Sequence, residues 1–208
     1  MPVNYTLYLV TDRKILKGRD IFEAVEAAVK GGVTLLQLRE KNISTSDFYN
    51  LALKMKTITT HYNIPLIIND RLDIALAIDA DGLHIGQDDM PIEVARRLLG
   101  KNKLLGYSVS NAKEAIYGEK NGADYLGAGP VYPTGSKSDA GKPIGTYGLK
   151  IIRNSVSIPI VGIGGISLSN ISQVKTTGID GISLISAILG NNDIEKSSKI
   201  LFNKWKNI

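Results

Sequence analysis

The sequence predicts an α/β protein, because eight strand-like segments alternate with amphipathic, helix-like segments along all 208 residues. Such an alternation favours parallel strands that are joined by helices. Three of the expected turns from helix to strand share a similar pattern, at Gly32-Val-Thr34, Gly122-Ala-Asp124 and Gly178-Ile-Asp180. No linker, low-complexity segment or change in composition divides the chain. We therefore predict one domain over residues 1–208, a single-domain (β/α)8 TIM barrel, with an open doubly wound sheet as the alternative.

The expected strands are short apolar runs that are bounded by polar or turn-forming residues. Eight parallel strands are enough to close a sheet into a barrel. In chain order they cover residues 8–11, 35–38, 66–69, 83–85, 105–109, 125–128, 160–162 and 182–185.

Between the strands, apolar residues recur with the helical period, and capping residues mark the helix ends. Asp20 with Glu23 resembles a capping box, and Gly31-Gly32 can end this helix in the left-handed region. Pro91 suits the first turn of a later helix, and Gly100 suits its end. The two clearest apolar faces comprise Ile21, Ala24, Val25 and Ala28 within residues 20–30, and Phe48, Leu51, Ala52, Met55 and Ile58 within residues 44–61.

The composition excludes several classes of protein. Hydrophobic residues make up 43% and charged residues 22%, which is ordinary for a globular protein. No apolar run approaches the roughly 18 residues of a membrane span, and the N-terminus lacks a signal-peptide pattern, so we expect a cytoplasmic protein without a membrane partner. The chain has no cysteine, which excludes disulfides, thiolate zinc sites and iron–sulfur clusters. Of the two histidines, His84 lies inside an apolar strand and is better explained as a hydrogen-bonded core residue than as a ligand.

The formal net charge of +5 is most simply explained by a solvated surface rich in lysine. Nucleic-acid binding requires a concentrated basic patch, and the densest basic stretches, residues 101–103 and 204–206, are too short to form one. A small anionic substrate fits this charge balance better, so we expect no nucleic-acid partner.

Polar side chains gather after the expected strands. In a parallel barrel the carboxyl ends of all strands meet at one face, and that face holds the active site. Gln37, Arg39 and Lys41 alternate along the second strand and its extension, so they point together, whereas Leu36 and Leu38 point the opposite way. The same end of the following strands offers Asn69, Asp70, Asp89, Ser108 and the segment 129–137.

Each of these residues also has a structural interpretation. Asp70 and Asp89 could each cap the helix that follows, and for either aspartate alone capping is the better interpretation. Arg39 and Lys41 could form a surface ion-pair network with Glu40. The functional hypothesis therefore depends on the convergence of strands two to six on one face.

Two kinds of anion site are expected at this face. Gly164 and Gly165 end the seventh strand and let a phosphate approach backbone N–H groups, and Ser186 follows the eighth strand. Loops after these two strands are a frequent phosphate site in barrels, although the glycines alone could serve a tight turn. The second site combines cations with Asp70 and Asp89, and Mg²⁺ is commonly held between such carboxylates and a pyrophosphate. The glycine run lacks the dinucleotide-binding fingerprint.

Seven motifs, in order and over nearly the whole chain, resemble those of the thiamine phosphate synthase family. They are QLREK (37–41), IIND (67–70), GLHIGQDD (82–89), GYSVSN (106–111), GAGPVYPTGSK (127–137), VGIGGI (161–166) and ISAI (185–188). The resemblance implies a Mg²⁺-dependent transferase that joins 4-amino-2-methyl-5-hydroxymethylpyrimidine diphosphate to 4-methyl-5-(2-phosphoethyl)thiazole, or its carboxylated form, and releases pyrophosphate. It is also compatible with a homo-oligomer.

The resemblance implies roles for individual residues as well. Catalytic roles fall on Arg39, Lys41, Ser108 and Lys137, and the Mg²⁺ ligands are Asp70 and Asp89. Of the substrate contacts, Thr134, Ser136, Gly165, Ile185 and Ser186 match positions that bind the thiazole phosphate. All substrate contacts together are Gln37, Leu38, Arg39, Glu40, Lys41, Asn69, Ser108, Thr134, Gly135, Ser136, Lys137, Gly165, Ile185 and Ser186.

The implied reaction is an ionisation of the pyrimidine C–O bond, after which the thiazole nitrogen traps the pyrimidine-methyl cation. Fixed cations would stabilise the charge that grows on the departing pyrophosphate. Residues 133–143 are predicted to form a mobile lid over the mouth. One departure from the family pattern is Ser110, which stands where a histidine is often found.

Three rival functions use the same fold. A thiazole tautomerase-like relative would lack most of the metal and lysine pattern, whereas Asp70, Asp89, Lys41 and Lys137 are present here. An isomerase or epimerase would need a poised base, but carboxylates among cations are expected to have a lowered pKa and to be poor bases. A non-catalytic phosphate-binding barrel would release no pyrophosphate.

Overall fold

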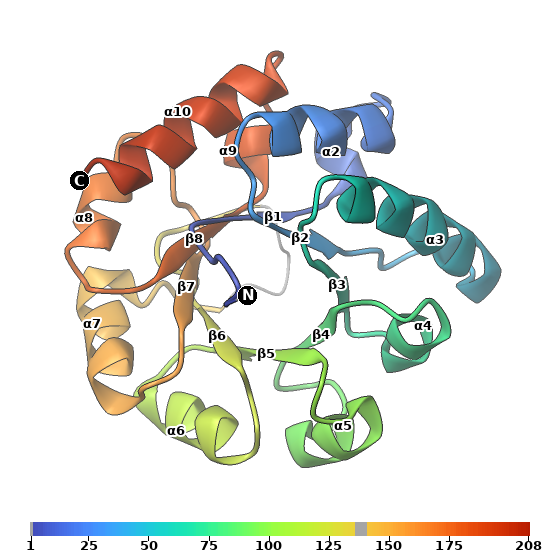
Figure 1. Cartoon of the computed structure of the whole chain (residues 1–208). Coiled ribbons are helices and arrows are strands. Elements are labelled where there is room, and N and C mark those ends of the chain that lie inside the picture. Colours follow the sequence, from blue (N-terminus) through green and yellow to red (C-terminus); the bar gives the residue numbers. More distant parts are fainter. Residues whose placement is uncertain (1, 136–140) are drawn as a thin grey trace.

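The computed structural model describes residues 2–135 and 141–208, and it confirms the predicted barrel. Eight parallel strands pair in sequence order, and the last pairs with the first to close the sheet (Figure 1). The strands are β1 (Leu7–Val10), β2 (Leu35–Leu38), β3 (Leu66–Asn69), β4 (Gly82–Ile85), β5 (Leu104–Val109), β6 (Tyr125–Ala128), β7 (Ile160–Ile163) and β8 (Gly181–Leu184). The open doubly wound alternative is therefore wrong.

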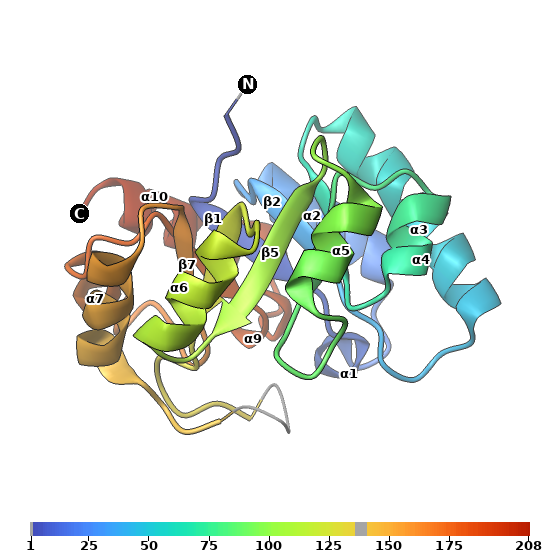
Figure 2. The same cartoon turned by 90° about the horizontal axis from the view of Figure 1, so that it is seen from below.

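The helices surround the barrel on its outside, and the N-terminal segment lies at the end opposite α1 (Figure 2). Ser44 and Asp20 cap α3 and α2 through their side chains, as the sequence predicts for Asp20. The helices in the described residues are α1 (Arg13–Leu16), α2 (Ile21–Lys30), α3 (Thr45–His61), α4 (Leu72–Ala77), α5 (Ile92–Leu99), α6 (Ala112–Lys120), α7 (Gly145–Ser155), α8 (Ile171–Lys175), α9 (Ser186–Leu189) and α10 (Ile194–Lys206).

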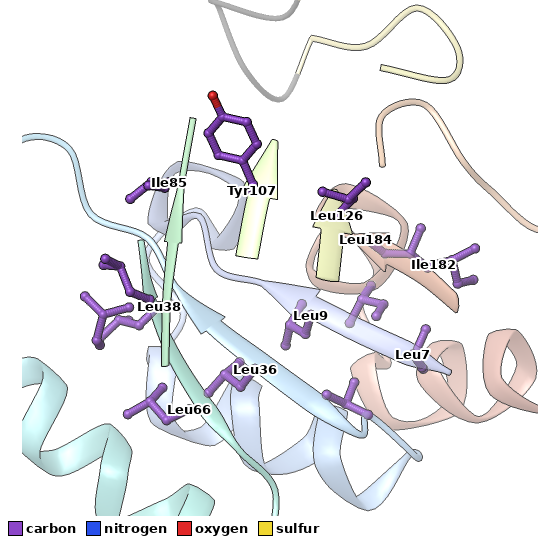
Figure 3. Packing of buried hydrophobic residues seen from close by; sticks show 14 of the residues in the cluster. Leu7, Leu9, Leu36, Leu38, Leu66, Ile85, Tyr107, Leu126, Ile182 and Leu184 are labelled. Atoms are coloured by element: carbon purple, nitrogen blue, oxygen red, sulfur yellow. The ribbon is translucent and has the colours of Figure 1, made fainter. Parts of the chain in front are cut away.

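Side chains along each strand alternate between the helices outside and the barrel interior. The outward set forms one large apolar cluster with the helices, to which Leu36 and Leu38 of β2 belong (Figure 3). Full burial of one such leucine contributes about 1.5–3 kcal/mol, so this layer is the main source of stability. The inward set at the amino ends of the strands is a smaller cluster that comprises Tyr5, Tyr8, Leu35, Ile67, Tyr125 and Val161.

A repeated pair of hydrogen bonds, which we call the strand clamp, joins each odd-numbered strand to the even-numbered strand that follows. The residue just before the even strand donates its backbone N–H to a carbonyl of the odd strand, and its side chain accepts the N–H of that same residue. The four pairs are Thr34 with Leu7, Asp81 with Leu66, Asp124 with Leu105 and Asp180 with Ile160. The Gly-x-Thr/Asp echo in the sequence therefore marks three of the four clamps.

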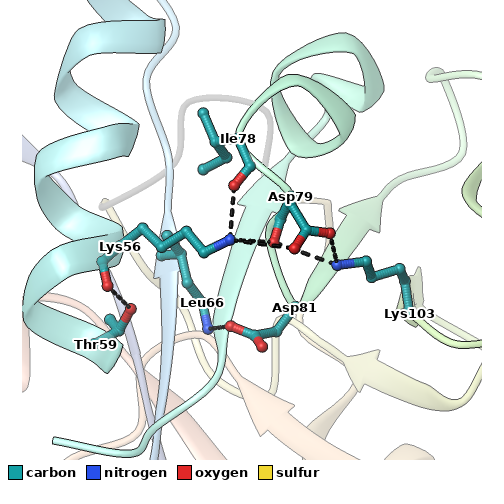
Figure 4. A network of polar contacts seen from close by, with 7 residues as sticks. All are labelled: Lys56, Thr59, Leu66, Ile78, Asp79, Asp81 and Lys103. Carbon is teal, nitrogen blue, oxygen red and sulfur yellow. Dashed lines mark hydrogen bonds and ion pairs between the residues drawn. The ribbon is translucent and has the colours of Figure 1, made fainter. Parts of the chain in front are cut away.

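The clamp of Asp81 lies in a polar network that also fixes the end of α4 (Figure 4). Lys56 of α3 donates from Nζ to the carbonyl oxygens of Ile78, at 2.7 Å, and Asp79, at 2.6 Å. Lys103 contacts the Asp79 carboxylate from the other side. The network lies at the amino ends of β3 and β4, remote from the face where the polar motifs meet.

Asp81→Ala is expected to lower the free energy of unfolding by about 1 kcal/mol, because the N–H of Leu66 loses its side-chain acceptor. Asp81→Asn keeps an acceptor oxygen at the same place and is expected to retain most of the stability. Urea unfolding of both variants checks this difference, and an Ala variant as stable as the Asn variant would contradict the role of the clamp.

Candidate active site

The carboxyl ends of the strands surround a cavity of about 620 Å³. Most residues that the sequence singled out converge here, although they come from strands far apart in the chain. Those that line the cavity are Arg39, Lys41, Asn69, Asp70, Asp89, Ser108, Thr134, Gly165, Ile185 and Ser186. The predicted meeting of acidic and basic groups on one face of the barrel is confirmed.

Lys41, Asp70 and Asp89 form the charged centre of the cavity. Lys41 Nζ lies 2.8 Å from Asp70 Oδ2, and Asp89 Oδ2 accepts the N–H of Gly86 at 2.7 Å. The backbone of Asp70 is left-handed, with φ of 61°, a conformation that aspartate tolerates better than most residues. Strained backbone of this kind is concentrated at functional sites.

The two carboxylates lie close enough to influence each other. Burial raises the pKa of Asp89, the N–H of Gly86 opposes this effect, and the neighbouring Asp70 carboxylate raises the pKa further. The expectation that surrounding cations lower the pKa of these carboxylates is therefore wrong for Asp89. The physical reason is that desolvation and the second carboxylate outweigh Lys41. A divalent cation between the two would relieve their repulsion.

Neither aspartate caps a helix through its side chain. The N-cap residues of α4 and α5 are Arg71 and Pro91, and neither helix receives a side-chain cap bond. The capping interpretation is therefore wrong for both Asp70 and Asp89, and their carboxylates face the cavity instead.

Three members of the predicted substrate segment lie outside the cavity lining. Leu38 packs in the outward apolar cluster. Glu40 pairs with Arg13, with Oε1 2.8 Å from Nε, and burial raises its pKa while Arg13 opposes that shift. Gln37 is buried inside the barrel, where its amide donates to the hydroxyl of Tyr8 at 2.7 Å. Among the described residues, no ion pair joins Glu40 to Arg39 or to Lys41, and Lys41 pairs with Asp70 instead. Arg39 acts on Glu40 only as a nearby charge that opposes the rise in its pKa.

The loop after β6 lies partly beyond what the structure describes. Ser136 and Lys137 are outside the described residues, and so is the central part of the predicted lid at 133–143. Gly135 is described and exposed, and it is not part of the cavity lining. Thr134, before the residues that the structure does not describe, and residues 141–144, after them, line the cavity.

The glycines after β7 line the cavity and also permit a close approach of the chain. Gly164 and Gly165 have φ of 95° and 65°, which few other residues adopt readily. A Cβ on Gly165 would lie 2.6 Å from the carbonyl oxygen of Pro133, and Tyr132 donates its N–H to Gly164. The tight-turn interpretation is therefore confirmed, and the phosphate site stays a prediction for glycines that line the cavity.

Several lining residues were missed at the level of sequence. Lys142 adds a third described cation beside Arg39 and Lys41, and Glu114 accepts from Ser110 N at 2.6 Å. Ser183 is 2% exposed, and its hydroxyl has no hydrogen-bond partner among the described residues. The sequence could have indicated this position, because Ser183 lies in the expected strand 182–185, whose side chains alternate between the outside and the inside of the barrel.

Ser183→Ala is expected to leave the free energy of unfolding unchanged or to raise it by up to about 1 kcal/mol, because no protein hydrogen bond is lost. Thr177→Val is the matched control: this buried hydroxyl donates to Val174 O at 2.7 Å, so its removal is expected to cost about 1 kcal/mol. Urea unfolding of both variants checks the prediction. A larger loss for Ser183→Ala than for Thr177→Val would refute it.

Comparisons with known proteins agree with this arrangement. A family model described as thiamine monophosphate synthase matches residues 7–188. The chain is 59% identical to a thiamine-phosphate synthase of Clostridium novyi, over 98% of this chain and 100% of that protein. It is 53% identical to one of Desulfitobacterium hafniense, over 100% of both chains.

Solved structures share the barrel fold of this chain. A thiamine phosphate pyrophosphorylase from Pyrococcus furiosus superimposes with a TM-score of 0.90 and 41% identity, over 99% of this chain and 97% of that one. A 3-hexulose-6-phosphate synthase, at 16% identity and a TM-score of 0.70, shares the fold. Among the described helices, none is long and apolar enough to cross a membrane. The chain belongs to the thiamine monophosphate synthase family.

Proposed function

We propose that this protein condenses 4-amino-2-methyl-5-hydroxymethylpyrimidine diphosphate with 4-methyl-5-(2-phosphoethyl)thiazole, or its carboxylate, to give thiamine phosphate and pyrophosphate. The relatives named above support the reaction class. The observation that carries the proposal is the contact of Lys41 with Asp70, with Asp89 beside them, in one cavity. A diphosphate that leaves without a protein nucleophile needs such a set of fixed charges.

The charged residues of the cavity would act on the leaving group. Arg39 and Lys41 donate hydrogen bonds only, so both would stabilise negative charge on the departing pyrophosphate. Asn69 is buried at the edge of the same cavity and would hold a diphosphate oxygen through its amide. Because these groups are already in place, they need no reorganisation when the C–O bond breaks. We propose the same role for Lys137.

The opposite side of the cavity would hold the second substrate. Gly165, Ile185 and Ser186 line it together, on the loops after β7 and β8. A phosphate held there would leave the thiazole ring directed toward the centre of the cavity, where its nitrogen attacks the pyrimidine-methyl carbon. Holding both rings in one cavity contributes to the rate through alignment.

The donor set at the centre fits Mg²⁺. Asp70 and Asp89 supply two carboxylates, and among the described residues no group of three or more histidine, cysteine, aspartate or glutamate side chains is arranged to hold a metal ion by itself. Mg²⁺ is usually bound by one or two carboxylates, with substrate phosphate oxygens and water as the remaining ligands. When bound there, Mg²⁺ would supply a Lewis acid that stabilises the negative charge on pyrophosphate.

The test is to incubate the protein with both phosphorylated heterocycles and Mg²⁺ and to measure thiamine phosphate and pyrophosphate together. We expect equal amounts of the two products, and no product when either heterocycle is omitted or EDTA is added. Parallel reactions with the thiazole phosphate and its carboxylate measure which form is preferred. Absence of thiamine phosphate from the complete mixture would overturn the proposal.

A further inference from the structure

A continuous chain of hydrogen bonds runs through the inside of the barrel to the cavity. It begins at Gln37 of β2, whose amide nitrogen donates to the hydroxyl of Tyr8 of β1 at 2.7 Å. The hydroxyls of Tyr8 and Tyr125 of β6 lie 2.8 Å apart, and the Tyr125 hydroxyl lies 3.0 Å from His84 Nδ1. His84 Nε2 lies 2.9 Å from the hydroxyl of Ser108, which lines the cavity.

The barrel interior is built to accommodate this chain. Tyr8 and Tyr125 are at most 1% exposed, and His84 is 6% exposed. Gly106 supplies the space, because a Cβ there would lie 2.3 Å from both His84 Nδ1 and the Tyr125 hydroxyl. Buried polar groups are costly unless they are hydrogen-bonded, so each link stabilises its neighbours in one arrangement.

The donors and acceptors of the chain fix its direction. The Gln37 amide nitrogen can only donate, so the Tyr8 oxygen accepts and its proton turns to Tyr125. Burial raises the pKa of both tyrosines, so each keeps its single proton. Tyr125 accepts from Tyr8 and must donate to His84 Nδ1.

The same reasoning sets the tautomer of His84. A neutral imidazole whose Nδ1 accepts a hydrogen bond carries its proton on Nε2. His84 Nε2 donates that proton to the Ser108 oxygen, so the hydroxyl proton of Ser108 points away from His84. Ser108 lines the cavity, so its proton can reach a bound molecule.

We propose that Gln37, Tyr8, Tyr125 and His84 are positioning residues that hold His84 as the Nε2–H tautomer and thereby make Ser108 a hydrogen-bond donor to the substrate. This inference rests on the proposed function, in which Ser108 contacts the pyrimidine. An aminopyrimidine offers ring nitrogens that accept and an amino group that donates. A donating Ser108 selects a ring nitrogen, and an analogue with a carbon at that position would leave the hydroxyl unpaired.

The first test is nitrogen NMR of the free protein with ¹⁵N-labelled histidine. The chain has only two histidines, so the His61→Gln variant assigns both sets of signals. We expect His84 to show a protonated Nε2 and an unprotonated Nδ1 in neutral solution. A protonated Nδ1, or an averaged mixture of tautomers, would overturn the proposal without any measurement of activity.

The second test is Tyr125→Phe, which removes the donor to Nδ1 and keeps the ring. We expect His84 to become a mixture of tautomers and kcat/KM to fall about tenfold, as for the loss of one oriented hydrogen bond. Tyr117→Phe is the matched control, because its hydroxyl donates to Glu93 on the surface, and it should change neither quantity. Unchanged tautomer and activity in Tyr125→Phe would overturn the proposal.

A double-mutant cycle separates this inference from the proposed function. If Tyr125 acts through Ser108, Tyr125→Phe should have no further effect on kcat/KM in a Ser108→Ala background. Additive losses would show that Tyr125 acts by another route and would overturn the positioning role. An unaffected Ser108→Ala single variant would instead overturn the contact of Ser108 with the pyrimidine, while the NMR result would still decide the tautomer.

Discussion

Asp70→Asn is expected to lower kcat by about 100- to 1,000-fold, the usual loss when one electrostatic contact to a developing charge is removed. The amide cannot carry the negative charge that pairs with Lys41 and would hold Mg²⁺. Asparagine tolerates the left-handed backbone of position 70, where φ is 61°, so the fold should be kept. Alanine at this position would combine lost charge with backbone strain and is the poorer test.

The measurement is kcat over a range of Mg²⁺ concentrations, with thermal unfolding of the same sample. We expect the variant to need more Mg²⁺ for half-maximal activity and to unfold like the parent protein. Asp73→Asn is the matched control, because Asp73 pairs with Arg71 and does not line the cavity. An Asp70→Asn enzyme with full activity and an unchanged Mg²⁺ requirement would remove Asp70 from the proposed metal site.

Gly106→Ala is expected to lower the free energy of unfolding by about 3 kcal/mol, the largest effect on stability that we predict for a single methyl group. The added Cβ would lie 2.2 Å from Tyr125 Cζ, a distance that real side chains do not reach. Tyr125 or His84 must therefore shift, and the buried hydrogen bond between them would be strained or broken.

Urea unfolding monitored by fluorescence is well suited to this measurement, because the single tryptophan, Trp205, is buried in the outward core. Gly141→Ala is the control, since a Cβ there meets no described atom within 4 Å. If Gly106→Ala were as stable as the parent protein, the barrel interior would rearrange at little cost in free energy. That result would contradict a rigid chain of hydrogen bonds inside the barrel.

Much of the architecture was accessible from the sequence because each βα unit carries its own local signals. All eight strands were placed within about one residue, and Asp20 caps α2 as its spacing predicted. The convergence of Asp70 with Asp89 was also predicted, since a closed parallel barrel brings all carboxyl ends to one face. Each of the seven motifs of the resemblance contributes at least one described residue to the cavity lining.

Other features could not be predicted, because they depend on contacts between distant residues. Tyr8 and Tyr125 are 117 positions apart, and nothing local indicates that their hydroxyls meet. The pairing of Glu40 with Arg13 likewise depends on a helix of only 4 residues, α1, whose pattern is too short to detect. The raised pKa of Asp89 reflects burial, which a count of neighbouring charges does not include.

The strand clamps have a consequence for how this barrel could be divided. Each clamp ties an odd strand to its successor, so the chain consists of four self-tethered strand pairs, β1–β2, β3–β4, β5–β6 and β7–β8. New termini opened between β2 and β3, between β4 and β5 or between β6 and β7 would keep the two strands of every clamped pair consecutive in the sequence. Circular permutants cut there should assemble more readily than those cut within a pair, where both tethering bonds must form between the two ends of the chain.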